Sequence, residues 1–151
     1  MYSAIFIFGA ILHSFIGQVS SIKTLHIVPH SHDDVGWRVT LDQYFDGSQK
    51  GVQWTNVDQT ISSVVEALLQ NPKRKFVQVE VKFFKMWWDE QTESTKNNTR
   101  FLVKNKQLEL INGGWSMHDE ACPTYEDMIN NHMIGHDFIL KEFGVKPTIG
   151  W

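Results

Sequence analysis

Short apolar runs alternate with longer stretches of helical periodicity along most of this 151-residue chain. The runs that predict strands are residues 23–29, 76–79, 107–111 and the beginning of another at 147–151. The segments that predict helices are 57–70, 83–92, 98–104 and 124–143. Such alternation is typical of a parallel sheet covered by helices. We therefore expect an α/β fold, and periodicity alone does not separate a closed barrel from an open doubly wound sheet.

Polar residues follow the first expected strand, where residues 29–37 read Pro-His-Ser-His-Asp-Asp-Val-Gly-Trp. Alternate side chains of an extended segment point the same way, so His32 and Asp34 should project to one side and Asp33 to the other. A neutral imidazole and a carboxylate can share one divalent ion, zinc among others. The alternative for an isolated His-x-Asp is a polar turn whose histidines are merely hydrogen-bonded.

A second polar segment follows the expected strand 107–111, where residues 111–121 read Ile-Asn-Gly-Gly-Trp-Ser-Met-His-Asp-Glu-Ala. In β/α folds, reactive groups collect beyond the carboxyl ends of the strands. We therefore expect Asp34 and Asp119 to come close to one another, although they lie far apart in the sequence.

These two segments together resemble the signatures of the family 38 glycoside hydrolases, the class II α-mannosidases. Residues 40–45, Thr-Leu-Asp-Gln-Tyr-Phe, are most similar to the lysosomal-type branch. Between the two segments, Val-Glu at 79–80, Phe-Phe at 83–84 and Trp-Trp at 87–88 resemble the family's strand and aromatic helix. The resemblance runs from about Lys23 to the last residue.

The resemblance implies the N-terminal part of a seven-stranded parallel β/α barrel that is incomplete in this chain. It also implies a retaining α-mannosidase in which Asp119 is the nucleophile, with Glu120 as an alternative carboxylate, and in which Trp37 is the aromatic platform beneath the sugar. A buried core position is the alternative for Trp37. The general acid would belong to a segment after Trp151.

The same resemblance implies one zinc ion, held by His32, Asp34 and Asp119, with a fourth protein ligand beyond Trp151. Zinc would orient the sugar hydroxyls and stabilise the distorted ring. A second pair, His132 and His136, is spaced to bind an ion on one helix face. The glutamate that a metalloprotease needs between its two histidines is absent there, so we do not expect a metal at that pair.

The N-terminus predicts entry into the secretory pathway. Residues 4–12 form an uninterrupted apolar run, and small residues at 20 and 21 offer a cleavage site, so we expect a signal peptide at 1–21 and the N-terminal portion of the catalytic domain at 22–151. The run lacks a preceding Lys or Arg, and the alternatives are a buried helix or a retained anchor. Asn97 begins an Asn-Asn-Thr glycosylation sequon.

The composition limits the kinds of partner that this protein is expected to bind. The formal charge of −3, from 14 basic and 17 acidic residues, leaves no basic footprint for nucleic acid. No apolar segment long enough to span a membrane follows the N-terminal run. The single cysteine, Cys122, has no internal disulfide partner. The expected partners are mannose-containing oligosaccharides and glycoproteins, and the sequence says nothing of the oligomeric state.

We therefore expect a zinc-dependent retaining α-mannosidase that acts on terminal α-linked mannose of N-glycans, in the lysosome or vacuole or secreted. Two alternatives remain open. One is a mannose-binding fragment without hydrolytic activity. The other is a different zinc hydrolase on a similar barrel, such as a polysaccharide deacetylase, which acetyl release would reveal.

Overall fold

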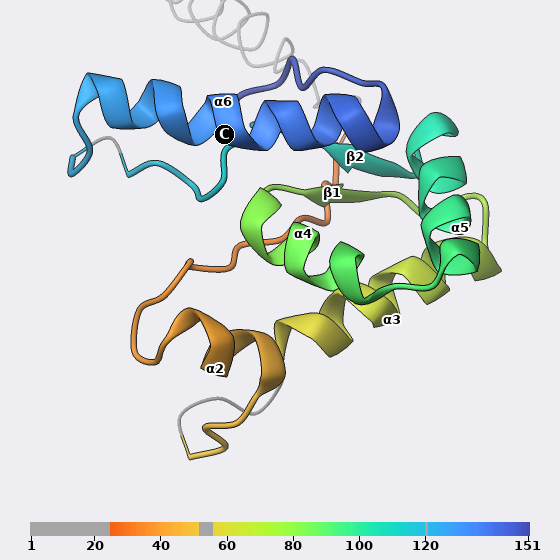
Figure 1. Cartoon of the computed structure of the whole chain (residues 1–151). Coiled ribbons are helices and arrows are strands. Elements are labelled where there is room, and N and C mark those ends of the chain that lie inside the picture. Colours follow the sequence, from red (N-terminus) through yellow and green to blue (C-terminus); the bar gives the residue numbers. More distant parts are fainter. Residues whose placement is uncertain (1–24, 52–55, 120) are drawn as a thin grey trace, which may run out of the picture.

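The computed structural model describes residues 25–51, 56–119 and 121–151, which form a mixed α/β fold with a small parallel sheet (Figure 1). The expected signal peptide and Glu120 lie outside these residues. In chain order the elements are α2 (Leu41–Asp46), α3 (Val57–Gln70), β1 (Phe76–Gln78), α4 (Val81–Glu90), α5 (Glu93–Lys104), β2 (Leu108–Leu110) and α6 (Tyr125–Phe143).

The sheet confirms parallel pairing. β1 and β2 run parallel, with Phe76 opposite Leu108 and Gln78 opposite Leu110. On the other side of β1, the amide of Ser31 donates to the carbonyl of Val77 at 2.9 Å. Beyond β2, the amide of Asn112 donates to the carbonyl of Ile149 at 2.7 Å. Neighbouring segments of the chain thus lie side by side in sequence order, as is common in sheets built from β/α units.

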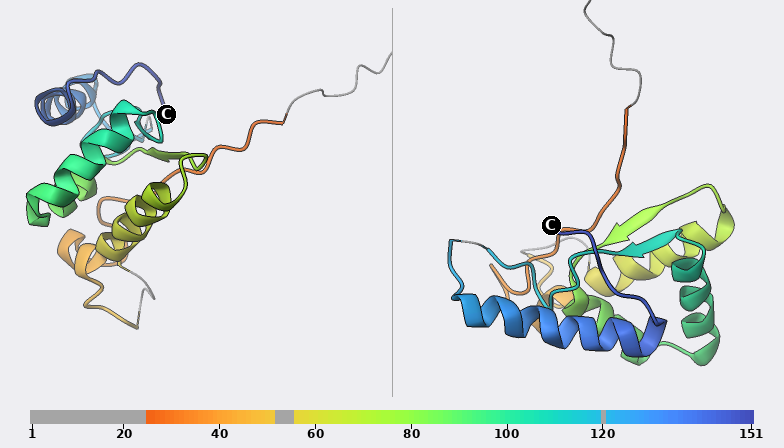
Figure 2. Two further views of the ribbon diagram at one scale, coloured as in Figure 1. Left: turned by 90° about the vertical axis from the view of Figure 1, so that its right-hand side faces the viewer. Right: turned by 90° about the horizontal axis from the view of Figure 1, so that it is seen from above.

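Two expected strands are wrong in extent. Within the described part of residues 23–29, Leu25 and Ile27 are 81% and 82% exposed, and pairing with β1 is limited to a bridge at His30. The reason is the shortness of β1: residues before Phe76 form a turn and offer no ladder to Leu25 or Ile27. Figure 2 shows this segment running away from the body of the fold. Residues 147–151 likewise form no strand.

Helices α3 and α6 begin and end close to the positions that their patterns predict. Buried Val57, Ile61, Val65 and Leu68 lie three or four residues apart on α3, and α6 is capped by Thr124 and by left-handed Gly144. The spacing of apolar residues in the segment 124–143 predicts an inner face that includes Ile129, Met133, Phe138 and Ile139. That prediction is partly wrong. Phe138 and Ile139 are buried, whereas Ile129 and Met133 are about half exposed, because the first half of α6 extends past the strands (Figure 1).

Capping residues explain two helical starts that differ from expectation, those of α2 and α5. Thr40 and Gln43 form a reciprocal capping box that starts α2, a helix that apolar periodicity did not indicate. Thr92 accepts a hydrogen bond from the amide of Thr95, which starts α5 five residues earlier than expected. Asn97 is exposed on that helix.

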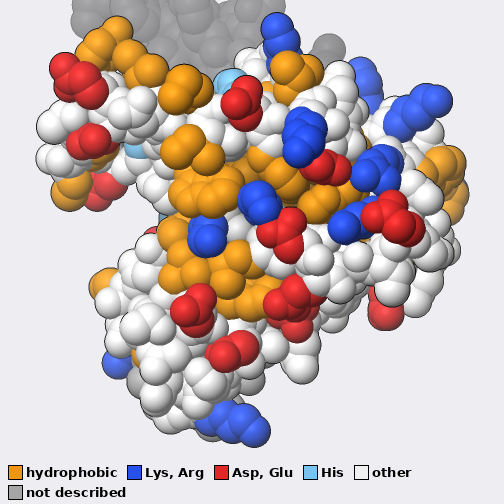
Figure 3. Space-filling view, viewed as in Figure 1, with side chains coloured by type: hydrophobic (Ala, Val, Ile, Leu, Met, Phe, Trp, Pro, Cys, Tyr) orange, Lys and Arg blue, Asp and Glu red, His pale blue; other side chains and the backbone are white. Residues whose placement is uncertain are grey.

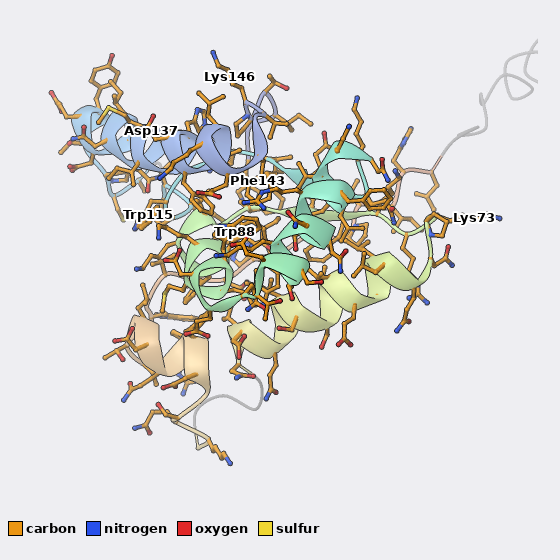
Figure 4. All side chains as sticks on the ribbon, turned by 45° about the vertical axis from the view of Figure 1, so that its right-hand side comes forward. Lys73, Trp88, Trp115, Asp137, Phe143 and Lys146 are labelled. Carbon is orange, nitrogen blue, oxygen red and sulfur yellow. The ribbon has the colours of Figure 1, made fainter. Side chains whose placement is uncertain are left out.

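An aromatic cluster joins α4, α5 and α6. The rings of Trp88 and Phe143 lie 4.7 Å apart between centroids (Figure 4), and the Arg100 guanidinium stands 4.9 Å from the Trp88 ring. Arg100 also forms an ion pair with Glu142 of α6 at 3.2 Å. Figure 3 shows hydrophobic side chains gathered across the middle of this face among charged ones. Burying such large aromatic surfaces is the main stabilising contribution here.

None of the helices in the described part of the chain is both long and apolar enough to cross a membrane.

Candidate active site

The backbone of the first motif, residues 29–37, is held at the carboxyl end of β1. The amide of Val77 donates to the carbonyl of Pro29 at 3.0 Å, and the amide of Val79 donates to Oγ of Ser31 at 2.8 Å. The motif then turns at Gly36, whose φ of +87° is readily adopted by glycine and whose amide donates to the carbonyl of Asp34. These bonds place the polar side chains at the edge expected for a β/α site.

His32 and Asp34 project together, as the alternation of the extended segment predicts. Nε2 of His32 lies 3.9 Å from Oδ1 of Asp34, and their side chains are 61% and 44% exposed. Asp33, between them in the sequence, is half-buried. Burial, followed by repulsion from Glu80, raises the pKa of Asp33 to about 6. The first motif therefore presents the side chains of His32 and Asp34 to solvent, while that of Asp33 is half-buried.

The second motif, residues 111–121, is held by α4 and α6. The amides of Val81 and Lys82, at the start of α4, donate to the carbonyls of Gly114 and Trp115 at 3.1 and 2.9 Å. From α6, Asn131 accepts from the amide of Ser116 at 2.9 Å and donates to its carbonyl at 2.7 Å. Asn131 was not among the candidate residues, since an asparagine on a helix carries no local signal of this contact.

The two motifs meet at one hollow. A cavity of about 300 Å³ is lined by residues 33–37 of the first motif and by Ser116 and Met117 of the second. This volume is at the lower end of those found for small-molecule sites. Trp37 lines the hollow and is 77% exposed, so its alternative role as a buried core residue is wrong. Trp115, by contrast, is half-buried against the core.

Asp119 lies in an adjoining hollow of about 380 Å³ that shares Ser116 and Met117 with the first. Its carboxylate is exposed and accepts a hydrogen bond from the amide of Ala121 at 3.0 Å. Its Oδ2 is also 3.7 Å from Sγ of Cys122, which is a free thiol. Across residues 25–51, 56–119 and 121–151, no three His, Cys, Asp or Glu side chains are grouped closely enough to hold a metal ion.

The helical histidine pair is engaged in hydrogen bonds. His132 contacts the carbonyl of Met128 and Oδ1 of Asn112, at 3.1 and 3.2 Å, and His136 contacts the carbonyl of Asn112 at 2.9 Å. Burial, followed by the charge of neighbouring His118, lowers the pKa of His132. Through these hydrogen bonds, His132 and His136 hold α6 against the second motif.

In parallel α/β folds, binding and catalytic residues collect in the loops beyond the carboxyl ends of the strands, where both motifs lie here. A sequence profile described as the Glycosyl hydrolases family 38 N-terminal domain matches residues 23–151. The chain belongs to glycoside hydrolase family 38.

Individual relatives agree with this family. A probable alpha-mannosidase of Arabidopsis thaliana is 53% identical over 127 residues, which cover 84% of this chain and 12% of the relative. The lysosomal alpha-mannosidase of Dictyostelium discoideum is 46% identical over 132 residues, covering 87% and 13%. The human lysosomal alpha-mannosidase is 42% identical over 133 residues, also covering 87% and 13%. The chain thus spans about an eighth of the length of these relatives.

Proposed function

We propose that this chain supplies part of the active site of a zinc-dependent retaining α-mannosidase. The observation that carries the proposal is the hollow lined by both motifs, where Asp34 and Trp37 meet the loop leading to Asp119. Ser116 and Met117 of that loop also line the adjoining hollow of Asp119. Family membership and relatives named alpha-mannosidases support the reaction class. The substrate would be terminal α-linked mannose of N-glycans.

The donor pair suits a zinc ion. Zinc bonds to imidazole nitrogen and carboxylate oxygen are each about 2.0–2.2 Å long. An ion could therefore bridge the 3.9 Å between His32 and Asp34 with little side-chain movement. In this proposal, Asp119 joins the pair as third ligand and a fourth protein ligand comes from a segment beyond Trp151. Bound zinc would act as a template and electrostatic stabiliser for the sugar hydroxyls.

Two further residues of this chain would act on the sugar, one as nucleophile and one as a binding surface. Asp119, as nucleophile, would attack the anomeric carbon and form a glycosyl ester, while a general acid protonates the departing oxygen. Its exposed carboxylate and its bond from the amide of Ala121 suit an ionised group held in a fixed direction. Trp37, open to solvent beside the pair, offers an aromatic face for the sugar ring.

The same proposal extends to the domain organisation, the cellular compartment and the glycosylation of the protein. We infer a signal peptide at residues 1–21 and the N-terminal portion of a family 38 catalytic domain at 22–151, whose parallel pairing is compatible with a seven-stranded β/α barrel. Relatives named lysosomal alpha-mannosidases favour the lysosome or vacuole. Asn97, exposed on α5, would carry a glycan in that compartment.

The test compares Asp119→Asn with Glu120→Gln in the complete polypeptide in which this sequence occurs. Hydrolysis of a chromogenic α-mannoside should fall about a thousandfold or more in the first variant, because the nucleophile is lost, and should remain measurable in the second. Zinc content is measured alongside, since Asp119 is also a proposed ligand. Equal rates in Asp119→Asn and the parent would refute the assignment. Mannoside binding without turnover in the parent would favour a binding protein.

A further inference from the structure

We propose that Glu80 is a positioning residue that fixes the place of the His32–Asp34 pair relative to the second motif. This inference rests on the proposed function, because it concerns the same metal-binding loop. Glu80 is a fully buried acidic residue, with 0% of its surface exposed. An uncompensated buried carboxylate is costly, so its hydrogen-bond partners indicate what it does.

Both oxygens of Glu80 bind the first motif. Oε2 accepts from the hydroxyl of Ser31 at 2.6 Å, and Oε1 accepts from the amide of Asp33 at 2.9 Å. These two donors lie on either side of His32 in the sequence. The backbone around His32 is therefore fixed at both ends by one carboxylate.

The hydroxyl of Ser31 both accepts and donates a hydrogen bond. It accepts a hydrogen bond from the amide of Val79 at 2.8 Å, so its single proton is directed to Glu80. A carboxylate offers acceptors to both the Ser31 hydroxyl and the Asp33 amide. A glutamine of the same shape has one acceptor oxygen and one NH₂ group, and would leave one of these two donors without its partner.

The residues after Glu80 bind the second motif. Glu80 occupies the N-cap position of α4, yet its side chain makes no capping hydrogen bond with the helix. The amides of Val81 and Lys82 are satisfied instead by the carbonyls of Gly114 and Trp115. Three consecutive residues thus hold the loop of the proposed ligand pair with a side chain and the loop leading to Asp119 with backbone amides.

A zinc ion bound by residues of both motifs requires that the two loops keep a fixed position relative to one another. Ligand bonds tolerate deviations of only about 0.2 Å. Groups that orient metal ligands typically change metal affinity by about 10- to 100-fold when they are replaced. We therefore infer that Glu80 sets zinc affinity through the loop, without contacting the ion.

The experiment measures zinc affinity by competition with a chelator in the complete polypeptide, comparing the parent with Glu80→Gln, Ser31→Ala and the double variant. Each single variant should bind zinc about tenfold or more weakly. The double variant should lose less than the sum, because both changes break the same contact. Ser31→Ala also carries the test if Glu80→Gln folds poorly.

Gln107→Leu is the matched control. Gln107 is another buried polar residue, and its Nε2 donates to the carbonyl of Leu68 at 2.9 Å, at the opposite end of the strands. Its replacement should lower the thermal midpoint without changing zinc affinity. A merely structural role for Glu80 would make Glu80→Gln behave like this control and would overturn the inference.

A second readout needs no metal. Hydrogen exchange at the Asp33 amide of the zinc-free protein should speed up in Glu80→Gln and stay as in the parent in Gln107→Leu. Parental zinc affinity in Glu80→Gln, alongside loss of zinc in His32→Ala, would refute the role of Glu80 and leave the proposed function standing. A parent that binds no zinc would refute the proposed function, and unchanged exchange at Asp33 would then refute the loop contact as well.

Discussion

Gly135 of α6 packs directly on the backbone of Gly113 in the second motif, so closely that a β-carbon at Gly135 would overlap the carbonyl oxygen of Gly113. Gly135 is buried in the middle of the helix, where glycine costs about 1 kcal/mol relative to alanine. The fold tolerates that cost because the close approach brings Asn131 to the loop that leads to Asp119.

This contact makes Gly135→Ala destabilising despite the better helix propensity of alanine. We expect a net loss of about 1–3 kcal/mol in the free energy of unfolding, because either the helix or the motif must move away. Denaturant unfolding measures this loss. Ile134→Ala, at a half-exposed neighbouring position, should change stability by about 0.5 kcal/mol or less. Equal stability of Gly135→Ala and the parent would contradict the packing described above.

Removing either residue of the ligand pair should remove zinc. In His32→Ala and in Asp34→Ala, zinc per polypeptide after dialysis should fall well below that of the parent, since each variant lacks a direct ligand. Stability of the zinc-free forms should hardly change, because the side chains of His32 and Asp34 are 61% and 44% exposed. Elemental analysis checks the first statement and thermal unfolding the second. Undiminished zinc in both variants would place any metal elsewhere.

Replacing Trp37 should affect the substrate and leave the fold intact. Trp37→Ala removes an exposed ring beside the cavity, so stability should stay within about 0.5 kcal/mol of the parent. Mannoside binding should weaken by about 1 kcal/mol, or several-fold, through loss of the aromatic face. Inhibition by a mannose analogue measures this change. Trp115→Ala is the contrasting variant, because its half-buried ring should cost stability, and identical behaviour of the two variants would contradict the distinction.

Acidification should weaken the contact of α6 with the second motif through His132. Its pKa is lowered in the folded state, by burial first and then by the neighbouring charge of His118, with His136 adding to the effect. The unfolded chain therefore binds the proton more readily, so stability is fully present above about pH 6.5 and declines as the pH falls below it.

The measurement for His132 is the thermal midpoint between about pH 8 and pH 5, in the parent and in His132→Gln. The parent should lose more stability than the variant over this range, since glutamine does not titrate and can still donate to Oδ1 of Asn112. Parallel curves for the two proteins would show that His132 does not contribute.

Local signals predicted the elements whose packing is also local. The three- and four-residue spacing of Val57, Ile61 and Val65 predicts α3, whose bounds agree with the structure, because one side of the helix faces the core throughout. The same rule failed for the first half of α6, where Ile129 and Met133 have the right spacing but face solvent. Periodicity identifies an apolar face and leaves open what covers it.

Strand prediction failed where the partner decided the outcome. The apolar residues Leu25 and Ile27 have strand composition, yet β1 begins too late along the sheet to pair with them. A strand exists only through its neighbour's hydrogen bonds, and composition does not carry that information. The capping box of Thr40 and Gln43, in contrast, was legible in the sequence and would have predicted α2.

The sequence by itself determined the family, the parallel α/β class and the joint projection of His32 and Asp34, since these depend on ordered residue identities and on the two-residue repeat of an extended chain. Only the tertiary structure decided that Ser116 and Met117 share a cavity with the first motif, that Trp37 is exposed, and that Glu80 holds Ser31 and Asp33. Those facts depend on contacts between residues about 50 to 80 positions apart, which form only when β1, α4 and α6 pack together.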